Sequence, residues 1–348
     1  MLAVVMALSG VVALILRLLS SHIRKYAAGG VCLSTARLDG KTALITGANC
    51  GIGRETALDL ASREAHGTVF IYLGSSNCAF NAALGSASAC YQATVPGVIL
   101  ACRDIEKGEE TAAEIRRRVG GAQVEVRELD LADTCSIRAF AQRFLREVNH
   151  LHILINNAGV MMCPYMKTAD GFEMHLGVNH LGHFLLTYLL IGLLKRSAPA
   201  RVVVVSSLAH YFGWIRFHDL HSQGSYNSGL AYCQSKLANV LFTRELSHRL
   251  RGSNVTVNTL HPGTVRSELV RHSTVMSLLF TLFSMFLKTP WEGAQTSIYC
   301  AVAEELHSIS GKHFSDCAPA SIAPQGRCDE TAQKLWDVSC ELLGIEWD

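Results

Sequence analysis

The chain has 348 residues, of which 49% are hydrophobic and 17% are charged, a composition that fits a globular core together with an apolar segment. Its formal net charge of +2 comes without a dense basic tract, which excludes the electrostatic surface of a nucleic-acid-binding protein. The twelve cysteines include no C-x-x-C pair and no metal-ligand spacing. This usage favours thiols in a reducing compartment over a disulfide framework.

The first residues of the chain form an apolar segment. Residues 2–19 are apolar apart from Ser9, Gly10 and Arg17, and as a helix they would span about 27 Å, close to the ~30 Å hydrocarbon core of a bilayer. Basic residues follow the segment, whereas a cleaved signal peptide begins with them, and positive flanks stay cytosolic. We therefore predict a membrane-anchor helix over residues 1–19 and a basic juxtamembrane linker over 20–37, with the body in the cytosol. A helix lying within one leaflet is the alternative.

A glycine-rich loop joins the first expected strand of the body to its first expected helix. Residues 41–46 have the pattern of a short buried strand, residues 54–63 that of a helix, and Gly47-Ala-Asn-Cys-Gly51-Ile-Gly53 connects them. Glycines let the backbone approach a pyrophosphate, and N–H groups at a helix start point at the anion. A plain strand-to-helix turn would look the same, so the loop alone is weak evidence.

Strand-like and helical patterns alternate through the rest of the chain. This order, with apolar strands, predicts a parallel sheet covered by helices on both faces. The strand-like runs are residues 98–101, 123–127, 151–155, 201–205 and 254–260, and the helical patterns include 107–118, 136–148 and 176–194.

Tyr232 and Lys236 are four residues apart, and Ser207 lies 25 residues upstream. On a helix this spacing puts an ammonium beside a phenol. An attraction of ~3 kcal/mol would lower the pKa of the phenol from about 10 to about 8, so that it could exchange a proton at neutral pH. Most pairs with this spacing are ordinary surface contacts, which is the alternative interpretation.

Taken together, the motifs resemble those of the short-chain dehydrogenase/reductases. Thr46-Gly47-x-x-x-Gly51-Ile-Gly53, Asn156-Asn-Ala-Gly159, Asn179, Ser207, Tyr232-x-x-x-Lys236 and His261-Pro-Gly263 occur in that family's order. Within the family, residues 151–164, 178–187 and 339–345 are similar to the microsomal retinol dehydrogenases. The resemblance implies an α/β fold with a single Rossmann-type doubly wound parallel sheet of about seven strands, in one catalytic domain over residues 38–348. It also implies an enzyme of the endoplasmic reticulum membrane that uses NADP(H) and interconverts retinal and retinol.

The resemblance further implies roles for individual residues. Tyr232 would protonate the carbonyl oxygen as hydride arrives, and Lys236 would lower the pKa of Tyr232 and bind the nicotinamide ribose. Ser207 would orient the carbonyl, and Asn179 would hold a water of a proton relay. The remaining cofactor contacts would come from the glycine loop, the residue after the second strand, and later loops: Gly47, Asn49, Cys50, Gly51, Ile52, Gly53, Arg103, Asp130, Asn157, Ala158, Gly159, Val265 and Ser267.

The choice between NAD and NADP can be argued from charge. NAD enzymes usually place a carboxylate after the second strand to bind the ribose 2′-hydroxyl. Here that strand is followed by Cys102-Arg103-Asp104. The guanidinium of Arg103 can donate two parallel hydrogen bonds to a 2′-phosphate, and Arg54 adds positive charge nearby. Asp104 is the competing signal, but Asp is also a favoured helix N-cap. We therefore predict NADP(H).

Two other patterns have simpler interpretations. His175, His180 and His183 have no carboxylate at a matching spacing, so we expect helix packing and no metal site. Residues 274–287 are apolar but too short to span a bilayer. The resemblance places them over the substrate pocket, where they could form a lid, while a plain core helix is the alternative.

The chain departs from the family pattern in one large way. Gly53 and Arg103 are 50 residues apart, far more than the family needs, and the extra run is about residues 64–96. Residues 68–73 are also strand-like and compete with residues 98–101 for the second strand position. We prefer 98–101, because Arg103 and a helix expected from Asp104 follow it as in the family pattern. The run joins a helix to a strand, so we expect it at the amino edge of the sheet, away from the site, at a loop-closure cost of ~2 kcal/mol.

The sequence therefore predicts NADPH-dependent, reversible reduction of retinal and related lipophilic aldehydes, with Tyr232 as general acid. Reduction of steroids or other lipid carbonyls is the alternative within the same class. A catalytically silent variant disabled by residues 64–96 is the alternative outside it. The sequence leaves the preferred retinoid isomer and the oligomeric state open.

Overall fold

The computed structural model describes residues 24, 26–63, 97–266 and 286–347. The predicted anchor (1–19), the extra run (64–96), Ser267 and nearly all of the apolar stretch 274–287 lie outside these residues.

One sheet organises the described residues, in the order β3-β2-β1-β4-β5-β6-β7-β8. Strands β1 to β7 are parallel, and the short β8 pairs antiparallel with β7. The predicted Rossmann-type sheet is therefore confirmed. The strands are β1 (Ala43–Thr46), β2 (Val98–Cys102), β3 (Val124–Glu128), β4 (Ile153–Asn156), β5 (Ala200–Val205), β6 (Val255–Leu260), β7 (His313–Ser315) and β8 (Ala318–Pro319).

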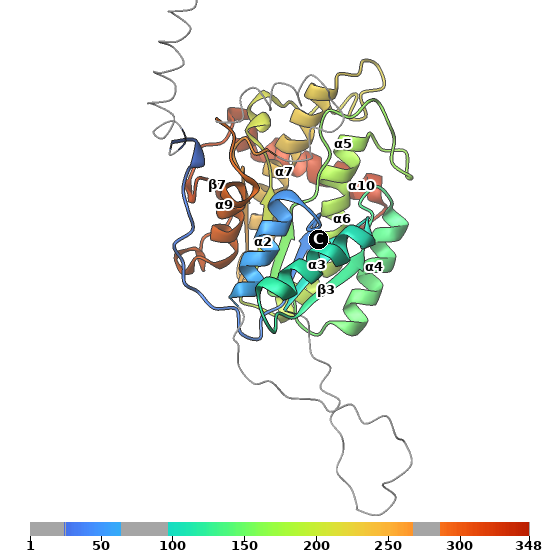
Figure 1. Cartoon of the computed structure of the whole chain (residues 1–348). Helices are drawn as coiled ribbons and strands as arrows, with labels where there is room; N and C mark the ends of the chain where they lie inside the picture. The colour runs from blue at the N-terminus through green and yellow to red at the C-terminus, as the bar shows by residue number, and fades with distance from the viewer. Residues whose placement is uncertain (1–23, 25, 64–96, 267–285, 348) are drawn as a thin grey trace, which may run out of the picture.

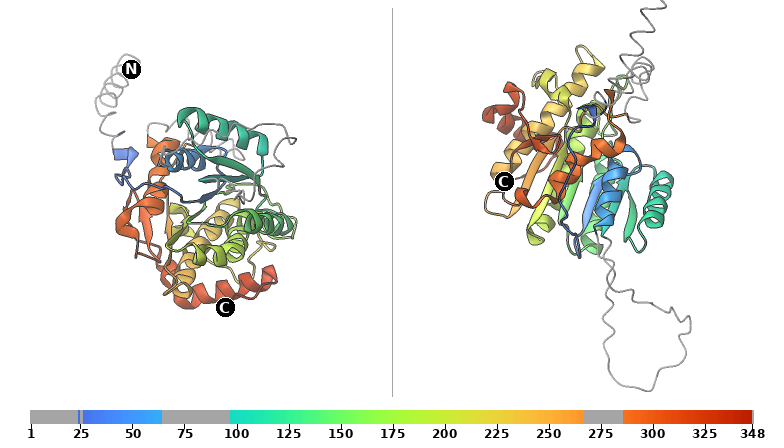
Figure 2. Two further views of the ribbon diagram at one scale, coloured as in Figure 1. Left: turned by 90° about the horizontal axis from the view of Figure 1, so that it is seen from below. Right: turned by 60° about the vertical axis from the view of Figure 1, so that its left-hand side comes forward.

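Helices cover both faces of the sheet, as Figures 1 and 2 show. One face carries α2 (Gly51–Ser62), α3 (Ile105–Arg118) and α9 (Pro290–Val302), which close one buried apolar cluster. The other face carries α4 (Thr134–Glu147), α6 (Gly182–Arg196), α7 (Ser228–Arg249) and α10 (Asp329–Leu343), which close a second cluster. Helices α9 and α10 and strands β7 and β8 were not predicted from the sequence.

The second strand is the one that the sequence favoured. Val98–Cys102 lies between β1 and β3, in parallel register with both. The residues that flank the extra run lie at the amino edge: Gly97 O accepts from Ala43 N at 2.8 Å, and Arg63 O accepts from Leu38 N at 3.0 Å. The run thus leaves and re-enters the fold at the edge opposite the carboxyl ends of the strands.

A long apolar helical stretch, Met174–Arg196, runs through the core. Within the described residues it is the one helix with the length and composition of a membrane span, but 78% of its most apolar window is buried inside the protein. It is therefore a core element. It begins as α5 (Met174–Leu176), continues as the π-helical turn η1 (Gly177–Leu181) and ends as α6. Sharp irregularities of this kind often mark functional sites.

β1 is the topological switch point of the sheet, because β2 lies on one side of it and β4 on the other. In open α/β sheets, ligands bind in the crevice beyond the carboxyl ends of the strands at such a point. The glycine loop of residues 47–53 begins there.

Candidate active site

The glycine loop packs tightly against the end of β4. Gly47 has φ +64°, which favours glycine, and a Cβ on Gly53 would lie 2.4 Å from Gly47 O. The Asn157 amide donates to Thr46 O at 2.8 Å, and the Thr46 hydroxyl accepts from the backbone N–H groups of Asn157 (2.9 Å) and Ala158 (3.0 Å). The two motifs, 110 residues apart in sequence, thus form one backbone cradle.

Gly53→Ala should distort this cradle, because its new Cβ would meet backbone that cannot move freely. We expect NADPH affinity to fall about tenfold or more and the free energy of unfolding to fall by about 1–3 kcal/mol. Cofactor titration and thermal unfolding measure both. Gly120→Ala is the control, since a Cβ there meets nothing within 4 Å. Equal NADPH affinity in the two variants would contradict the close-approach role of Gly53.

A cavity of about 470 Å³ opens at the carboxyl edge of the sheet. It brings together most of the residues that the sequence predicted. Those that line it are Gly47, Asn49, Cys50, Gly51, Ile52, Gly53, Arg103, Asp130, Asn157, Ala158, Gly159, Ser207, Tyr232, Lys236 and Val265. Asn179 lies behind the wall, and Ser267 lies outside the described residues.

Ser207, Tyr232 and Lys236 meet on one side of this cavity. Ser207 precedes the short 3-10 helix η2 (Leu208–Phe212), while Tyr232 and Lys236 lie one turn apart on α7. Ser207 hydrogen-bonds Tyr232. The Lys236 ammonium donates to Val205 O at 3.1 Å and lies 5.7 Å from the Tyr232 ring centroid. The neighbouring Ser206 also lines the cavity, but it is buried and its hydroxyl donates to Lys236 O at 2.7 Å, so Ser207 is the serine that bonds Tyr232.

The expected pKa of Tyr232 is wrong in this structure. Burial raises the pKa of Tyr232 to about 12, and the hydrogen bond with Ser207 offsets this only in part. Burial also lowers the pKa of Lys236 to about 8. The sequence argument used a half-solvated pair on a helix surface, whereas desolvation disfavours the charged form of both groups here.

Asn179 lies in the π-helical turn η1, and its side chain is fully used. Its carbonyl accepts from Val160 N at 2.8 Å, and its amide donates to Val160 O (3.0 Å) and Ser235 Oγ (2.9 Å). Ser235 in turn donates to the Tyr232 carbonyl at 2.8 Å. The turn is thereby fixed to the loop after β4 on one side and to α7 on the other.

His183 links this turn to the glycine loop, a connection that the sequence did not reveal. Its Nδ1–H donates to Asn179 O at 3.0 Å, and its Nε2 accepts from the Thr46 hydroxyl at 2.8 Å. Burial lowers the pKa of His183 to about 4, so the ring is neutral and this proton arrangement is stable near pH 7. The bond from His183 to Asn179 O could have been suggested by the i, i+4 spacing of the two residues, whereas the bond to Thr46 has no signal in the sequence.

The other two histidines of the stretch are also buried and bonded. His180 Nε2 lies 3.1 Å from Ser339 Oγ. His175 Nδ1 lies 2.7 Å from Glu173 Oε1, and its Nε2 lies 3.4 Å from Cys163 Sγ. Burial lowers the pKa of His175, but bonds to Cys163 and Glu173 outweigh it and raise that pKa to about 9. The His175 ring stands edge-on to Tyr232 at 6.1 Å, so this cluster supports the wall behind the phenol.

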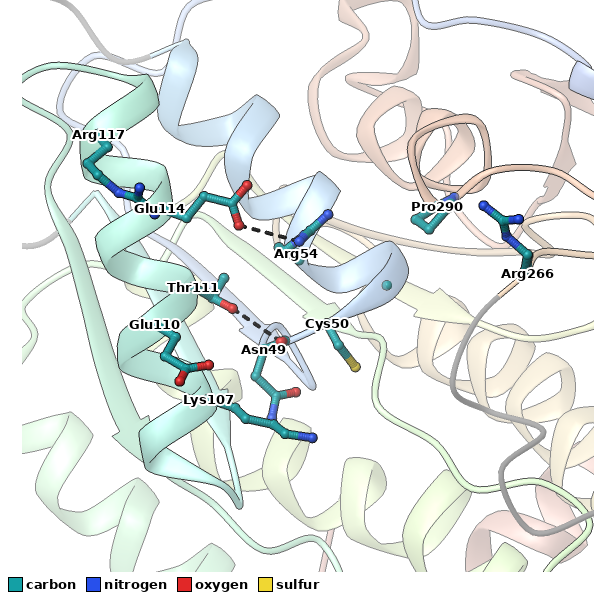
Figure 3. Close-up of a pocket in the computed structure, with 11 residues that line it drawn as sticks. Asn49, Cys50, Arg54, Lys107, Glu110, Thr111, Glu114, Arg117, Arg266 and Pro290 are labelled. Carbon is teal, nitrogen blue, oxygen red and sulfur yellow. Dashed lines mark hydrogen bonds and ion pairs between the residues drawn. The ribbon is translucent and has the colours of Figure 1, made fainter.

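A second, more open pocket of about 740 Å³ continues outward between α2 and α3. It shares Asn49, Cys50, Gly51 and Lys107 with the first cavity. Figure 3 shows Arg54 directed toward Glu114, with Arg266 and Pro290 across the opening. Arg54 forms ion pairs with Glu55 (2.7 Å) and Glu114 (3.3 Å), so the positive charge predicted there is partly balanced by neighbouring carboxylates.

Asp104, the competing carboxylate after the second strand, has the contacts of a helix N-cap. Asp104 is the N-cap of α3, where Oδ1 accepts from Lys107 N at 3.1 Å. Arg103 and Lys107 are exposed and line the first cavity on either side of it. Two cations thus flank the end of β2.

Comparison with known proteins agrees with this geometry. The family described as short chain dehydrogenase matches residues 82–276, more than half of the chain. Retinol dehydrogenase 12 of Homo sapiens is 58% identical over 333 residues, covering 96% of each chain. The chain belongs to the short-chain dehydrogenase family. It is an oxidoreductase acting on CH–OH groups, with a nicotinamide cofactor.

Two further relatives fit this membership. Retinol dehydrogenase 11 of Homo sapiens is 56% identical over 334 residues, covering 96% of this chain and 95% of that protein. An uncharacterized protein of Mycobacterium paratuberculosis, solved by crystallography, has a TM-score of 0.68 at 34% identity and covers 92% of this chain and 99% of its own. The family match begins inside the extra run, at residue 82, and leaves out the glycine loop.

Proposed function

We propose that this enzyme reduces retinal, and related lipophilic aldehydes, to the alcohol with NADPH in a reversible reaction. The observation that carries the proposal is the group formed by Ser207 and the buried Tyr232 and Lys236, in the cavity that the glycine cradle also lines. The relatives named retinol dehydrogenase 12 and 11, at 58% and 56% identity, support the retinoid as substrate.

Tyr232 is the proton donor in this proposal. A phenol with a pKa of about 12 is fully protonated at neutral pH, which suits donation to a carbonyl oxygen and disfavours the phenolate that alcohol oxidation needs. Ser207, hydrogen-bonded to Tyr232, lies where it can orient the carbonyl and stabilise its developing negative charge. Because the same groups catalyse the reverse step, the direction of net reaction follows the supply of reduced cofactor.

Lys236 and Asn179 support the proton transfer from Tyr232 in two different ways. Lys236 lies close enough to Tyr232 to stabilise its phenolate after transfer. Asn179 acts through its side chain, which hydrogen-bonds Ser235 on α7 and Val160 in the loop after β4. These bonds hold the two elements in place and so define where a relay water can bind. We assign Asn179 a positioning role, because it does not line the cavity.

The residues present fit a dinucleotide, which would supply the hydride. Gly47 and Gly53 have no side chains, which lets the backbone of the loop come close to a diphosphate at the first turn of α2. Gly159 lies beside Asn179 and Lys236, where a Cβ would be close to Asn179 Oδ1, at 3.1 Å. Arg103 and Lys107 would hold the 2′-phosphate of NADPH, and Asp130 would lie at the adenine end of the cavity.

Arg103→Ala tests the cofactor choice. Removing a fork that binds a 2′-phosphate should raise KM for NADPH about tenfold or more and leave KM for NADH nearly unchanged, because NADH has no group for Arg103 to bind. Steady-state kinetics with both cofactors measures the ratio. Arg143→Ala, an exposed arginine on α4, is the control. An unchanged NADPH/NADH preference in Arg103→Ala would refute the assignment.

The substrate end of the cavity is apolar. Val160, Met161, Met174, Val178 and Leu208 line it beside Tyr232, which suits a polyene or another lipid chain. We propose that residues 1–19 anchor the enzyme in the endoplasmic reticulum membrane, followed by a linker over 20–37 and a cytosolic catalytic domain over 38–348. A lipid aldehyde would reach such an enzyme from the bilayer.

The test is NADPH oxidation by membranes that contain the whole chain, with retinal, a steroid ketone and a short-chain aldehyde offered in turn. Retinal should have the highest kcat/KM. A higher value for the steroid would make the enzyme a steroid reductase. Absence of all activity, with activity present once residues 64–96 are deleted, would identify the chain as a silent variant of the family.

A further inference from the structure

Large apolar side chains are exposed mainly at one edge of the sheet. Phe212 and Trp214 are each 69% exposed, and Trp291 is 49% exposed. Leu208 and Leu230 are also exposed. These five residues follow β5 or stand in the first turn of α7 or α9, and such helices start at the carboxyl edge of a parallel sheet. We call them the aromatic rim.

The opposite edge is different. Among the described residues, two exposed leucines lie there: Leu145 in the last turn of α4, and Leu33 in the segment beside Arg63 at the end of α2. Exposed patches rimming one face of a soluble domain usually mark an interaction surface, because each exposed aromatic side chain costs hydration free energy. The asymmetry therefore needs a partner at the carboxyl edge.

The rim is held rigidly and is not a frayed loop. A Cβ on Gly213 would lie 2.4 Å from the Cys233 carbonyl, so the segment between Phe212 and Trp214 is packed onto α7. Gln325 donates to the carbonyls of Tyr211 (3.0 Å) and Gly213 (2.9 Å), and the Tyr211 hydroxyl donates to Ser321 O at 2.8 Å. The aromatic side chains are thus presented outward by a fixed backbone.

The N-terminal part of the chain identifies the partner. Arg24 is ion-paired with Glu292, which adjoins Trp291 in the first turn of α9. The apolar run of residues 2–19 ends five residues before Arg24, and five residues reach at most about 17 Å. Any bilayer that contains residues 2–19 must therefore lie close to the rim at Trp291.

We propose that the aromatic rim rests on the bilayer surface, so that the cavity opens toward the lipid. Trp, Phe and Leu are the residues that enter the boundary between head groups and acyl chains. Leu208 belongs both to the rim and to the cavity lining, which gives a lipid aldehyde an apolar path from bilayer to Tyr232. The inference rests on the proposed anchoring by residues 1–19.

Tryptophan fluorescence tests the orientation without using catalysis. The full chain is placed in phosphatidylcholine vesicles whose upper acyl chains carry bromine, a contact quencher. Trp214 and Trp291 should account for most of the quenching, so Trp214→Phe and Trp291→Phe should each reduce it, and the double variant should lose nearly all of it. Trp336, buried at 2% exposure, supplies an internal signal that stays unquenched. Quenching that is equal in wild type and double variant would overturn the proposal.

A kinetic test separates docking from pocket shape. Phe212→Asp should raise KM for retinal supplied in vesicles about five- to tenfold, while KM for a water-soluble short-chain aldehyde stays unchanged. Leu145→Asp, at the opposite edge, should change neither. Equal rises for both aldehydes in Phe212→Asp would place Phe212 in the pocket and overturn the docking role. Loss of retinal turnover with intact quenching would instead count against the proposed function alone.

Discussion

Tyr232→Phe is expected to lower kcat/KM for aldehyde reduction by about 10³–10⁴-fold, while NADPH still binds. A positioned general acid contributes about 10²–10⁴-fold, and here the same hydroxyl also completes the bond with Ser207. The ring itself is 7% exposed and keeps its packing in the variant, including the edge contact with His175. The loss should therefore appear in kcat, measured by NADPH oxidation in membranes, with cofactor affinity measured separately by fluorescence.

Tyr188→Phe on α6 is the matched control, since Tyr188 is half-buried, packs against Trp347 and does not line the cavity. It should retain activity within about twofold. Tyr232→Phe with more than a tenth of wild-type activity would show that another group delivers the proton. Loss of NADPH binding in Tyr232→Phe would instead indicate a structural role for the hydroxyl.

The parts of the site that could be predicted are those set by local sequence. The glycine loop, the Tyr232–Lys236 spacing and the positions of β1 to β6 all follow from patterns within one or two elements. The second strand was chosen correctly over residues 68–73 because Arg103 and an N-cap aspartate follow it. The resemblance to a known family then added Asn179 and Ser207 to the predicted site.

The parts that failed depend on burial and on contacts between distant elements. The pKa of Tyr232 was misjudged because a helical spacing says nothing about how deeply α7 is covered. The ion pair of Arg54 with Glu114 was not foreseen, because Glu114 lies 60 residues away on α3. The bond from Thr46 to His183 and the cluster around His175 have no local signature, and β7, three residues long with a histidine at its start, is too short to recognise.

A long extra run between α2 and β2 is compatible with an intact site. Its two flanking residues hydrogen-bond at the amino edge, beside Leu38 and Ala43. The cradle, Ser207 and Tyr232 all lie at the carboxyl edge. Because β2 keeps its register with both neighbours, the strand ends that carry Arg103 and the glycine loop stay in place.

Lys236→Met is expected to abolish activity and at the same time to stabilise the protein without cofactor. Burial lowers the pKa of Lys236 from 10.5 to about 8, so the charged form is disfavoured by about 3 kcal/mol in the folded state. Methionine fills similar volume without a charge. Val205 O, which loses the ammonium, still accepts from Asn239 at 3.3 Å. The melting temperature near pH 7 should therefore rise by about 2–6 °C, while kcat/KM falls at least about 10³-fold.

The pH dependence gives this prediction its sign. Below pH 8 the lysine is charged in both the folded and unfolded states, and the folded state bears the desolvation cost. Between pH 8 and 10.5 the unfolded chain holds more protons than the folded one, so this group makes the wild type more stable as pH rises. The stability advantage of Lys236→Met should therefore shrink across that interval and be lost above it. An advantage independent of pH, or a Lys236→Met variant less stable than wild type at pH 7, would mean that the ammonium is compensated by contacts with neighbouring groups. The charged form of Lys236 would then not lower the free energy of unfolding of the wild type.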